Sequence, residues 1–261
     1  MNFDELLASP ASQGLKAPAS WAQGRATFGG LVAALAYDRM ARTVAADRPM
    51  RSMQVSFVGP VTPDCELAIE AELLREGRGV SQARANIIQE GETRLAALAS
   101  FGGGRESTVH VEAEPAPEAA DPEACQGLPY TEGVTPEFIQ HIEMRWAFGS
   151  MPFSGRGGRH MGGWMRFRSP PSSIGDAQLI ALIDAWPPTL LPHLKSPALT
   201  STLSWSFDIV HPRPAINPDE WLLYRATIDQ AGHGYGHTHA GIWTRKGELV
   251  AVSRQAVTVF G

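Results

Sequence analysis

An acidic residue, Asp184, interrupts an otherwise apolar stretch of the chain at residues 179–186. The stretch contains strong helix formers and stops at the tandem proline of 187–188, so the sequence predicts a helix over 175–186. A carboxylate is costly there, because it lies in apolar surroundings and near the negative end of the helix dipole. Such a broken local rule indicates a functional residue, although an Asp that caps a loop or pairs with an Arg would look the same.

An amide, Gln255, lies on the last predicted strand, 249–259, and faces the core. By the two-residue period of a strand it shares a face with Leu249, Ala251, Val257 and Val259. A buried amide must find hydrogen-bond partners, so Gln255 joins Asp184 as a polar group directed into an apolar interior.

Metal and thiol chemistry fit the sequence less well. His237 and His239 share a strand face and His233 precedes them, but no Cys, Asp or Glu completes a ligand set nearby. Two cysteines, Cys65 and Cys125, have no metal-ligand spacing and imply no disulfide framework. We therefore expect no metal ion.

The elements that must position these residues repeat in two halves. Residues 76–87 match residues 231–242 at an offset of 155, which indicates a duplicated domain. Each half reads as an apolar helix followed by four strands, and such a helix needs a sheet wrapped around it. The predicted helices are 31–44 and 175–186, and the predicted strands are 52–61, 66–75, 81–89, 94–101, 200–210, 220–229, 235–244 and 249–259. Further strands are expected at 21–28, 138–148 and 164–168.

The predicted fold is therefore α+β, with two units that each wrap a curled antiparallel sheet around one helix. An Ala-, Pro- and acid-rich segment near 112–127 reads as a solvated linker. It divides the chain into an N-terminal unit, 1–111, a linker, 112–130, and a C-terminal unit, 131–261. The offset places Ser100 opposite Gln255, so only the second half has the amide and one site per chain is expected.

Composition excludes several classes of partner. The net charge of −5 argues against a nucleic-acid-binding surface. No apolar run is long enough to span a bilayer, and the first residues carry acids where a signal peptide needs bases. We expect a cytoplasmic protein with neither a nucleic-acid nor a membrane partner.

Several motifs resemble acyl-CoA thioesterases of the thioesterase II type, whose fold is a double hotdog. They are Phe-Gly-Gly at 28–30, His-Pro-Arg-Pro at 211–214, Glu-Trp-Leu-Leu-Tyr at 220–224, and Gly-Glu-Leu-Val-Ala at 247–251 followed by Arg-Gln at 254–255. The resemblance covers nearly the whole chain. It implies an acyl-CoA substrate, no cofactor, and a homodimer or homotetramer.

The resemblance also implies a site. In that family an Asp, a Thr or Ser, and a Gln of the second half hold the attacking water, and these match Asp184, Thr202 and Gln255. The stretch from Thr202 to the proline-rich turn is longer than the family pattern, so Thr200 and Ser204 stay open as alternatives on the same predicted strand face.

Thioester hydrolysis needs a base for the water and donors for the developing oxyanion. Asp184 would be the base, and the N–H of Gly30 at a helix start is a candidate donor that would bind the substrate. A glycine that lets helix and sheet approach closely is the structural alternative for Gly30. A hotdog enoyl-CoA hydratase and a non-catalytic acyl-CoA-binding protein are the other functions to separate.

Overall fold

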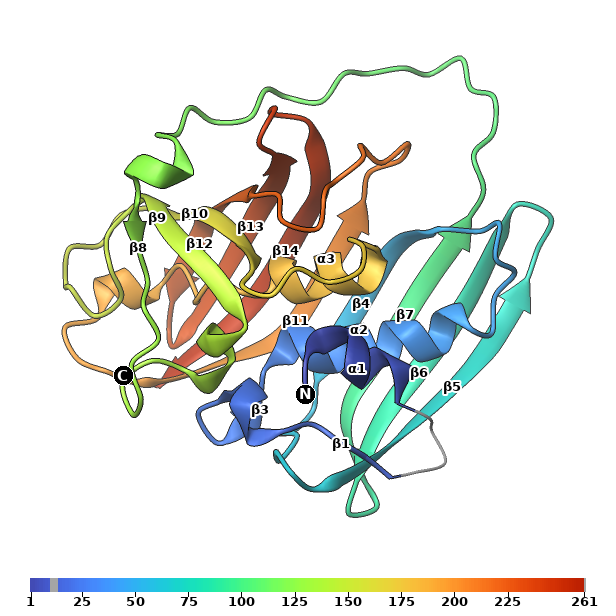
Figure 1. Ribbon diagram of the computed structural model, residues 1–261, viewed down its shortest axis with the longest axis horizontal. Coiled ribbons are helices and arrows are strands. Elements are labelled where there is room, and N and C mark those ends of the chain that lie inside the picture. Colours follow the sequence, from blue (N-terminus) through green and yellow to red (C-terminus); the bar gives the residue numbers. More distant parts are fainter. Residues whose placement is uncertain (10–13, 261) are drawn as a thin grey trace.

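One antiparallel sheet of twelve strands dominates the computed structural model, which describes residues 1–9 and 14–260 (Figure 1). Its strand order is β1-β5-β6-β7-β4-β11-β14-β13-β12-β10-β9-β8. The strands are β1 (Leu15–Lys16), β4 (Met50–Phe57), β5 (Glu66–Glu76), β6 (Val80–Gln89), β7 (Glu92–Gly102), β8 (Gln126–Gly127), β9 (Ile142–Phe148), β10 (His160–Phe167), β11 (Leu199–Ile209), β12 (Leu222–Gly232), β13 (Tyr235–Thr244) and β14 (Leu249–Phe260).

The sheet is built from two copies of one arrangement. In the first unit the strands lie in the order β5-β6-β7-β4, and in the second unit β12-β13-β14-β11. The copies join where β4 pairs with β11, from Ser56 opposite Ser204 to Ser52 opposite Asp208. This arrangement confirms the predicted pair of α+β units. We propose residues 1–111 and 131–261 as their limits; residues 10–13 and 261 lie outside the described part of the chain.

Two helices, α2 (Gly29–Ala41) and α3 (Asp176–Ile183), form the centre of the core and pack against each other. Most of their residues are fully buried, which agrees with helices that are apolar on every side. Gly30 permits the contact, because a Cβ there would come within 2.9 Å of the Ala181 carbonyl oxygen. The close approach expected at Gly30 is thus between two helices rather than between helix and sheet.

Helix α3 is shorter than the predicted 175–186. It ends at Ile183, and Asp184 is its C-cap residue, with φ −89° and ψ −2°. The residue before a proline avoids the helical conformation, so the tandem proline ends the helix before Trp186 is reached. The critical carboxylate therefore sits at the end of the helix rather than within it.

Other segments differ from the sequence prediction in detail. The strand expected at 21–28 is a 3₁₀ turn, η2 (Ala19–Trp21), followed by a small ribbon of β2 (Ala22–Gln23) and β3 (Ala26–Thr27). The strand expected at 138–148 begins with a 3₁₀ turn, η4 (Glu137–Gln140), and extends only from Ile142. The remaining helical elements are α1 (Phe3–Ala8), η3 (Pro122–Ala124) and η5 (Leu191–His193).

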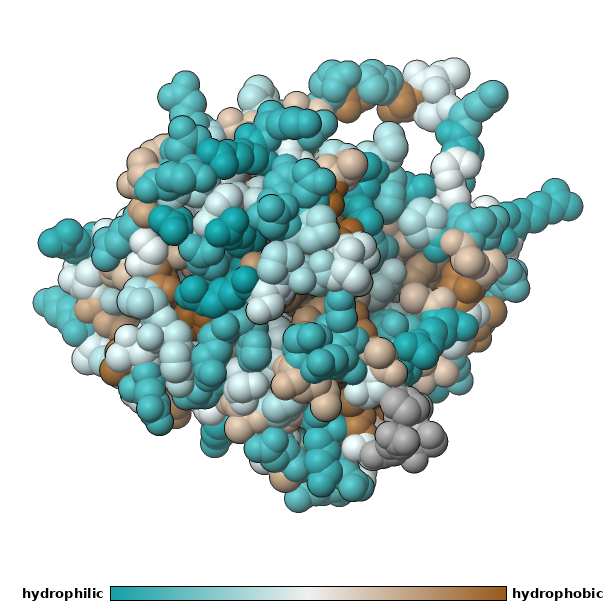
Figure 2. Space-filling view, viewed as in Figure 1, coloured by the Kyte–Doolittle hydropathy of each residue, from teal (hydrophilic) through white to brown (hydrophobic). Residues whose placement is uncertain are grey.

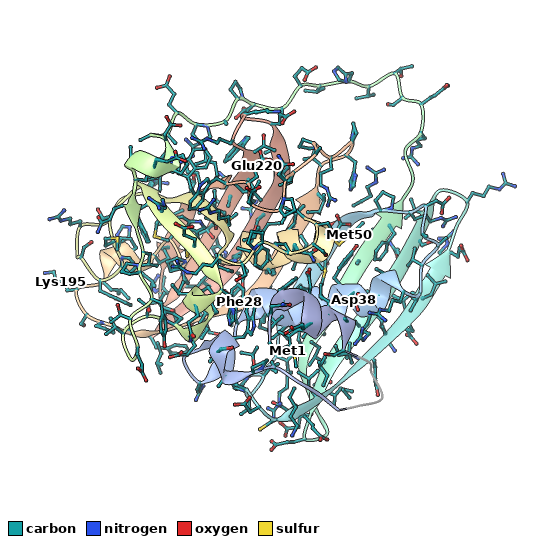
Figure 3. The ribbon with its side chains drawn as sticks, in the orientation of Figure 1. Met1, Phe28, Asp38, Met50, Lys195 and Glu220 are labelled. Carbon is teal, nitrogen blue, oxygen red and sulfur yellow. The ribbon has the colours of Figure 1, made fainter. Side chains whose placement is uncertain are left out.

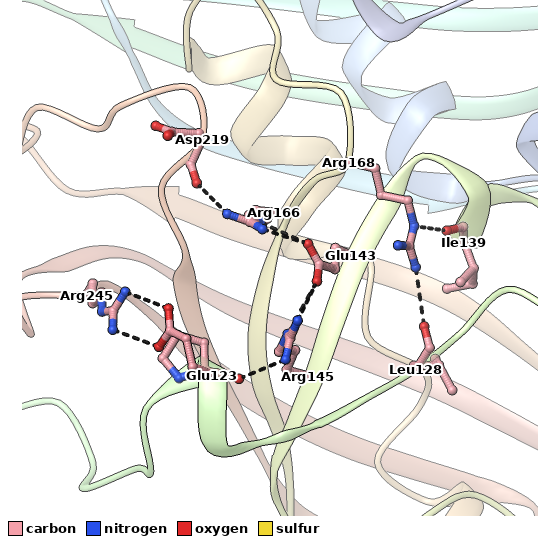
Figure 4. A network of polar contacts seen from close by, with 10 residues as sticks. Glu123, Leu128, Ile139, Glu143, Arg145, Arg166, Arg168, Asp219 and Arg245 are labelled. Carbon is pink, nitrogen blue, oxygen red and sulfur yellow. Dashed lines mark hydrogen bonds and ion pairs between the residues drawn. The ribbon is translucent and has the colours of Figure 1, made fainter.

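The linker is solvated at its start and attached at its end. Figure 2 shows it arching clear of the body on the face seen. Near η3 it packs on the outer face of the sheet, where Ala116, Ala119 and Cys125 cover a cluster of Trp164, Trp221, Leu223 and Trp243. Arg245 reaches Glu123 at 2.9 Å, and Arg145 links the Pro122 carbonyl to Glu143 (Figure 4). The linker therefore lies on the surface, as predicted, and only a few of its side chains are partly covered where it is attached to the sheet.

None of the helices in residues 1–9 and 14–260 combines the length and the hydropathy that crossing a bilayer requires.

Candidate active site

Two residues singled out from the sequence, Asp184 and Gln255, meet in the structure. Gln255 lies in the middle of β14 and Asp184 directly follows α3. The Gln255 side-chain Nε2 donates a hydrogen bond of 3.2 Å to Asp184 Oδ1. The sheet face and the end of the central helix thus bring together an acid and an amide that are 71 residues apart in the chain.

The start of α2 holds the same carboxylate from the other side. The backbone N–H of Gly30 donates to Asp184. The Oδ2 atom lies 2.8 Å from the position that a Cβ on Gly29 would take, so Gly29 leaves room for the acid. The positive end of the α2 dipole therefore faces the carboxylate. The sequence alone shows only the unfavourable dipole of α3, because the contact of Asp184 with the start of α2 depends on how the two helices pack.

Burial raises the pKa of Asp184 to about 7, although the hydrogen bonds from Gly30 and Gln255 act in the opposite direction. At pH 7 an aspartic acid in water is fully ionised, whereas Asp184 gains and loses its proton near that pH. A carboxylate with this pKa is well matched to general-base catalysis at neutral pH.

Thr202 lies next to this pair on the inner face of β11. It is half-buried and pairs with Val257, two residues from Gln255 on the neighbouring strand. Among the described residues the Thr202 hydroxyl makes no hydrogen bond; only the Thr202 carbonyl oxygen accepts one, from Ser201. Thr200 shares the face but pairs with Val259, one step further away.

A β-bulge removes Ser204 from the same face. The pairing with β14 shifts between Thr202 and Ser204, and Leu203 is the extra residue. Beyond it the buried positions are Trp205, Phe207 and Ile209, while Ser204 is exposed. The expectation that Ser204 shares the face of Thr202 was wrong, because a regular two-residue period does not pass through a bulge.

An aromatic group that sequence reasoning did not assign to the site lies beside Asp184. The rings of Trp186 and Tyr224 stack with 6.0 Å between centroids, and Trp146 meets Trp186 edge-on at 4.8 Å. Burial and, to a lesser extent, the charge of Asp184 raise the pKa of Tyr224, so its hydroxyl remains a donor. That hydroxyl has no hydrogen-bond partner among the described residues. Tyr224 belongs to the 220–224 motif, which served only for recognition of the family.

The first unit lacks this constellation. Gln255 pairs with Thr238, and the equivalent of Thr238 at the 155-residue offset is Ala83, which pairs with Ala99. The counterpart of Gln255 is therefore the buried Ala99, and the assignment of Ser100 was wrong by one position. By the same register Met50, opposite Phe101, corresponds to Thr202, opposite Val257.

One of the histidines that invited a metal interpretation, His239, makes a different contact. His239 Nδ1 lies 2.6 Å from Asp229 Oδ1, and Arg254 pairs with the same carboxylate. Among the described residues, no three or more His, Cys, Asp or Glu side chains are grouped to hold a metal ion.

Comparison with known families shows to which family the chain belongs. Residues 17–102 match the model of the acyl-CoA thioesterase N-terminal domain, and residues 122–259 match that of the C-terminal domain. The chain belongs to the acyl-CoA thioesterase family. It is a thioesterase of the type II kind that the sequence motifs indicated. No curated protein sequence matches this thioesterase at a significant level.

Solved structures confirm the double-hotdog fold of this thioesterase. A conserved protein of unknown function with a hot dog fold, from Alicyclobacillus acidocaldarius, has a TM-score of 0.83 and 24% identity, covering 99% of this chain and 98% of its own. The acyl-CoA thioesterase II TesB2 of Mycobacterium marinum has a TM-score of 0.74 and 24% identity, covering 90% of each chain. A tesB protein of Mycobacterium avium has a TM-score of 0.76 and 18% identity over 100% of both chains.

Proposed function

We propose that this thioesterase hydrolyses a fatty acyl-CoA to the free acid and CoA, with a water molecule held by Asp184, Thr202 and Gln255. The observation that carries the proposal is the contact between Gln255 and an Asp184 carboxyl whose pKa is about 7. The inward position of Thr202, diagonal to Gln255, supports a third contact to the same water.

In the proposed reaction Asp184 takes a proton from the water as its oxygen attacks the thioester carbonyl carbon. The tetrahedral intermediate then collapses, the carbon–sulfur bond breaks, and the CoA thiolate recovers a proton from Asp184. Thr202 and Gln255 orient the water and so remove part of the entropic barrier. The first step leaves Asp184 protonated and the second returns it to the ionised form, so the complete cycle restores the starting protonation state.

The developing oxyanion needs a hydrogen-bond donor, and the two candidates, Gly30 and Tyr224, receive different roles. Gly30, expected from the sequence to bind the substrate, donates its N–H to Asp184 in the structure. We propose that Gly30 first positions the carboxylate and lies close to the bound thioester. The Tyr224 hydroxyl, which has no other partner in the described chain, is the donor proposed for the developing oxyanion.

We also propose a homodimer or homotetramer in the cytoplasm. Apolar side chains on the outer face of central strands support association through the sheets, since Leu98 is 50% exposed and Val252 is 40% exposed. Size-exclusion chromatography with light scattering measures the assembly, and a monomer at micromolar concentration would contradict it.

The activity test is incubation with a panel of saturated and unsaturated acyl-CoAs of increasing chain length and a thiol-reactive dye. Release of free CoA supports the proposal and identifies the preferred chain. Binding without release would indicate an acyl-CoA-binding protein. Conversion of an enoyl-CoA without thiol release would indicate a hydratase, and either outcome would contradict the proposal.

A further inference from the structure

A pocket opens at the end of β4 that lies away from Asp184. Its volume is about 620 Å³, and its wall includes Arg51, Arg105 and His211 with the main chain of Gly79 and of residues 102–104. It lies at the Met50 end of β4, whereas the ring of Phe57, at the other end of that strand, contacts Gly29 near Asp184. In the view of Figure 3 Met50 and Asp38 both appear to the right of Phe28, which directly precedes α2.

The internal duplication relates this pocket to the proposed active site. Met50 corresponds to Thr202, and the bulge that follows each of them places Arg51 where the second unit has Leu203. The position of the pocket in the first unit therefore corresponds to the Thr202 end of β11 in the second unit. Met50 and Ala99 stand in the first unit where Thr202 and Gln255 stand in the second, so the first unit has no counterpart of these two proposed water-holding residues.

The charge of the pocket is unbalanced. Arg51 donates its Nε–H to the Gly102 carbonyl at 2.7 Å, and its two terminal nitrogens have no partner in the described chain. Arg105 has no hydrogen-bond or ion-pair partner there either, and its Nη1 lies over Gly79, 3.7 Å from where a Cβ would be. The wall residues identified include no carboxylate. Two unpaired guanidinium groups that open on one cavity make a receptor for phosphate, which they bind in a bidentate manner.

A histidine in the wall, His211, is held in place by the fold but is neutral at pH 7, so the positive charge of the pocket comes from the two arginines. His211 is half-buried, and its Nε2 bonds the Met50 carbonyl at 3.0 Å. Burial lowers its pKa, and the nearby charge of Arg51 acts in the same direction. Residues 102–104 carry no side chains, so a ligand can approach their main chain closely. A volume of about 620 Å³ lies within the range of about 300–1,000 Å³ that small-molecule sites have.

We propose that this pocket binds a nucleotide through its phosphate groups, as a site separate from the one that hydrolyses the thioester. The ligand chemistry is a phosphorylated nucleoside, supplied either by CoA or by a free nucleotide. The choice of CoA rests on the proposed function, because CoA would be both part of the substrate and a product. The existence of the site rests on the pocket alone.

The test is calorimetric titration of the whole chain with CoA, 3′,5′-ADP, ADP and inorganic phosphate. The Arg105→Gln variant and the Arg51→Gln/Arg105→Gln variant are compared with wild type and with Arg25→Gln/Arg75→Gln. The last variant loses two exposed positive charges elsewhere and is the matched control. We expect the Kd of 3′,5′-ADP to rise at least about tenfold in the double pocket variant and to stay unchanged in the control. Arg105 has no partner in the described fold, so the single variant gives a readout even if the Arg51 change impairs folding.

The relative affinities of the four ligands show whether the site binds CoA or a free nucleotide. Tighter binding of CoA and 3′,5′-ADP than of ADP identifies CoA, and equal binding identifies a free nucleotide. No nucleotide binding by wild type, or equal binding by pocket and control variants, would overturn the site. Hydrolysis of an acyl-N-acetylcysteamine thioester, which lacks the nucleotide, should be unaffected by the pocket variants. If wild type hydrolyses neither this nor an acyl-CoA, the proposed function fails independently of the titration.

Discussion

Gln255 Nε2 and Asp184 Oδ1 are 3.2 Å apart, and the N–H of Gly30 reaches the same carboxylate from the start of α2. Three elements from both units thus converge on one acid: the end of α3, the start of α2 and the middle of β14. The duplication explains this geometry, since the two central helices of a double hotdog pack together and the end of one meets the start of the other.

Replacement of Thr202 by Val should lower kcat about two- to tenfold, because one hydrogen bond to the proposed water, about 0.5–1.5 kcal/mol, is lost. Ser204→Ala is the matched control, since the bulge at Leu203 directs Ser204 outward. Steady-state hydrolysis of the preferred acyl-CoA checks both variants. A larger effect of the Ser204 change than of the Thr202 change would contradict the proposed role of Thr202.

Replacement of Tyr224 by Phe should lower kcat by about 10²–10³ if its hydroxyl stabilises the oxyanion. The melting temperature should hold, because the hydroxyl has no partner in the described fold and the stack with Trp186 persists. Tyr235→Phe, at an exposed position on β13, is the control. Unchanged hydrolysis by the Tyr224 variant would remove this residue from the mechanism.

The rate should depend on pH through Asp184. Because the base must be ionised and its pKa is about 7, kcat/KM should rise with pH and level off above about 7. Hydrolysis measured from pH 5 to 9 gives the profile. A rate that stays flat down to pH 5 would contradict a base with this pKa.

Stability should depend on pH in the opposite sense to that of an ordinary aspartate. The folded pKa of about 7 lies above the ordinary value of 3.8, so the folded chain holds the proton more tightly and loses stability as pH rises from about 4 to 7. Asp184→Asn removes this dependence. The melting temperature of the variant should therefore rise relative to that of wild type between about pH 4 and 7, and should stay higher above pH 7. If the melting temperature of the variant instead falls relative to that of wild type over this pH range, the ionised carboxylate stabilises the fold.

The sequence predicted the strands and the repeat well, because alternating patterns and tight turns are local signals. Residues 235–244, for example, form β13 as expected. The prediction failed where the structure of a segment depends on its contact with an element distant in the sequence. The bulge at Leu203 depends on pairing with β14, so Ser204 could not be separated from Thr202 by periodicity.

The surroundings of Asp184 could not be predicted from the neighbouring sequence either. Asp184 was found as an anomaly in an apolar stretch, but the helix start that holds it comes from the other unit. Tyr224 was read only as part of a recognition motif, since its approach to Asp184 depends on the curvature of the sheet around α3. The last residues of the linker were judged by composition alone, and their attachment depends on the tryptophans of the outer face.

The most direct measurement is hydrolysis and thermal unfolding of the Asp184→Asn variant. Asparagine keeps the size and one acceptor oxygen but cannot take a proton at neutral pH, so kcat should fall by about 10²–10⁴ with little change in substrate binding. The melting temperature at pH 8 should hold or rise, because a costly buried charge is removed. A variant that melts much earlier than wild type yet keeps a near-normal kcat would show that Asp184 serves the fold, and would contradict the proposed mechanism.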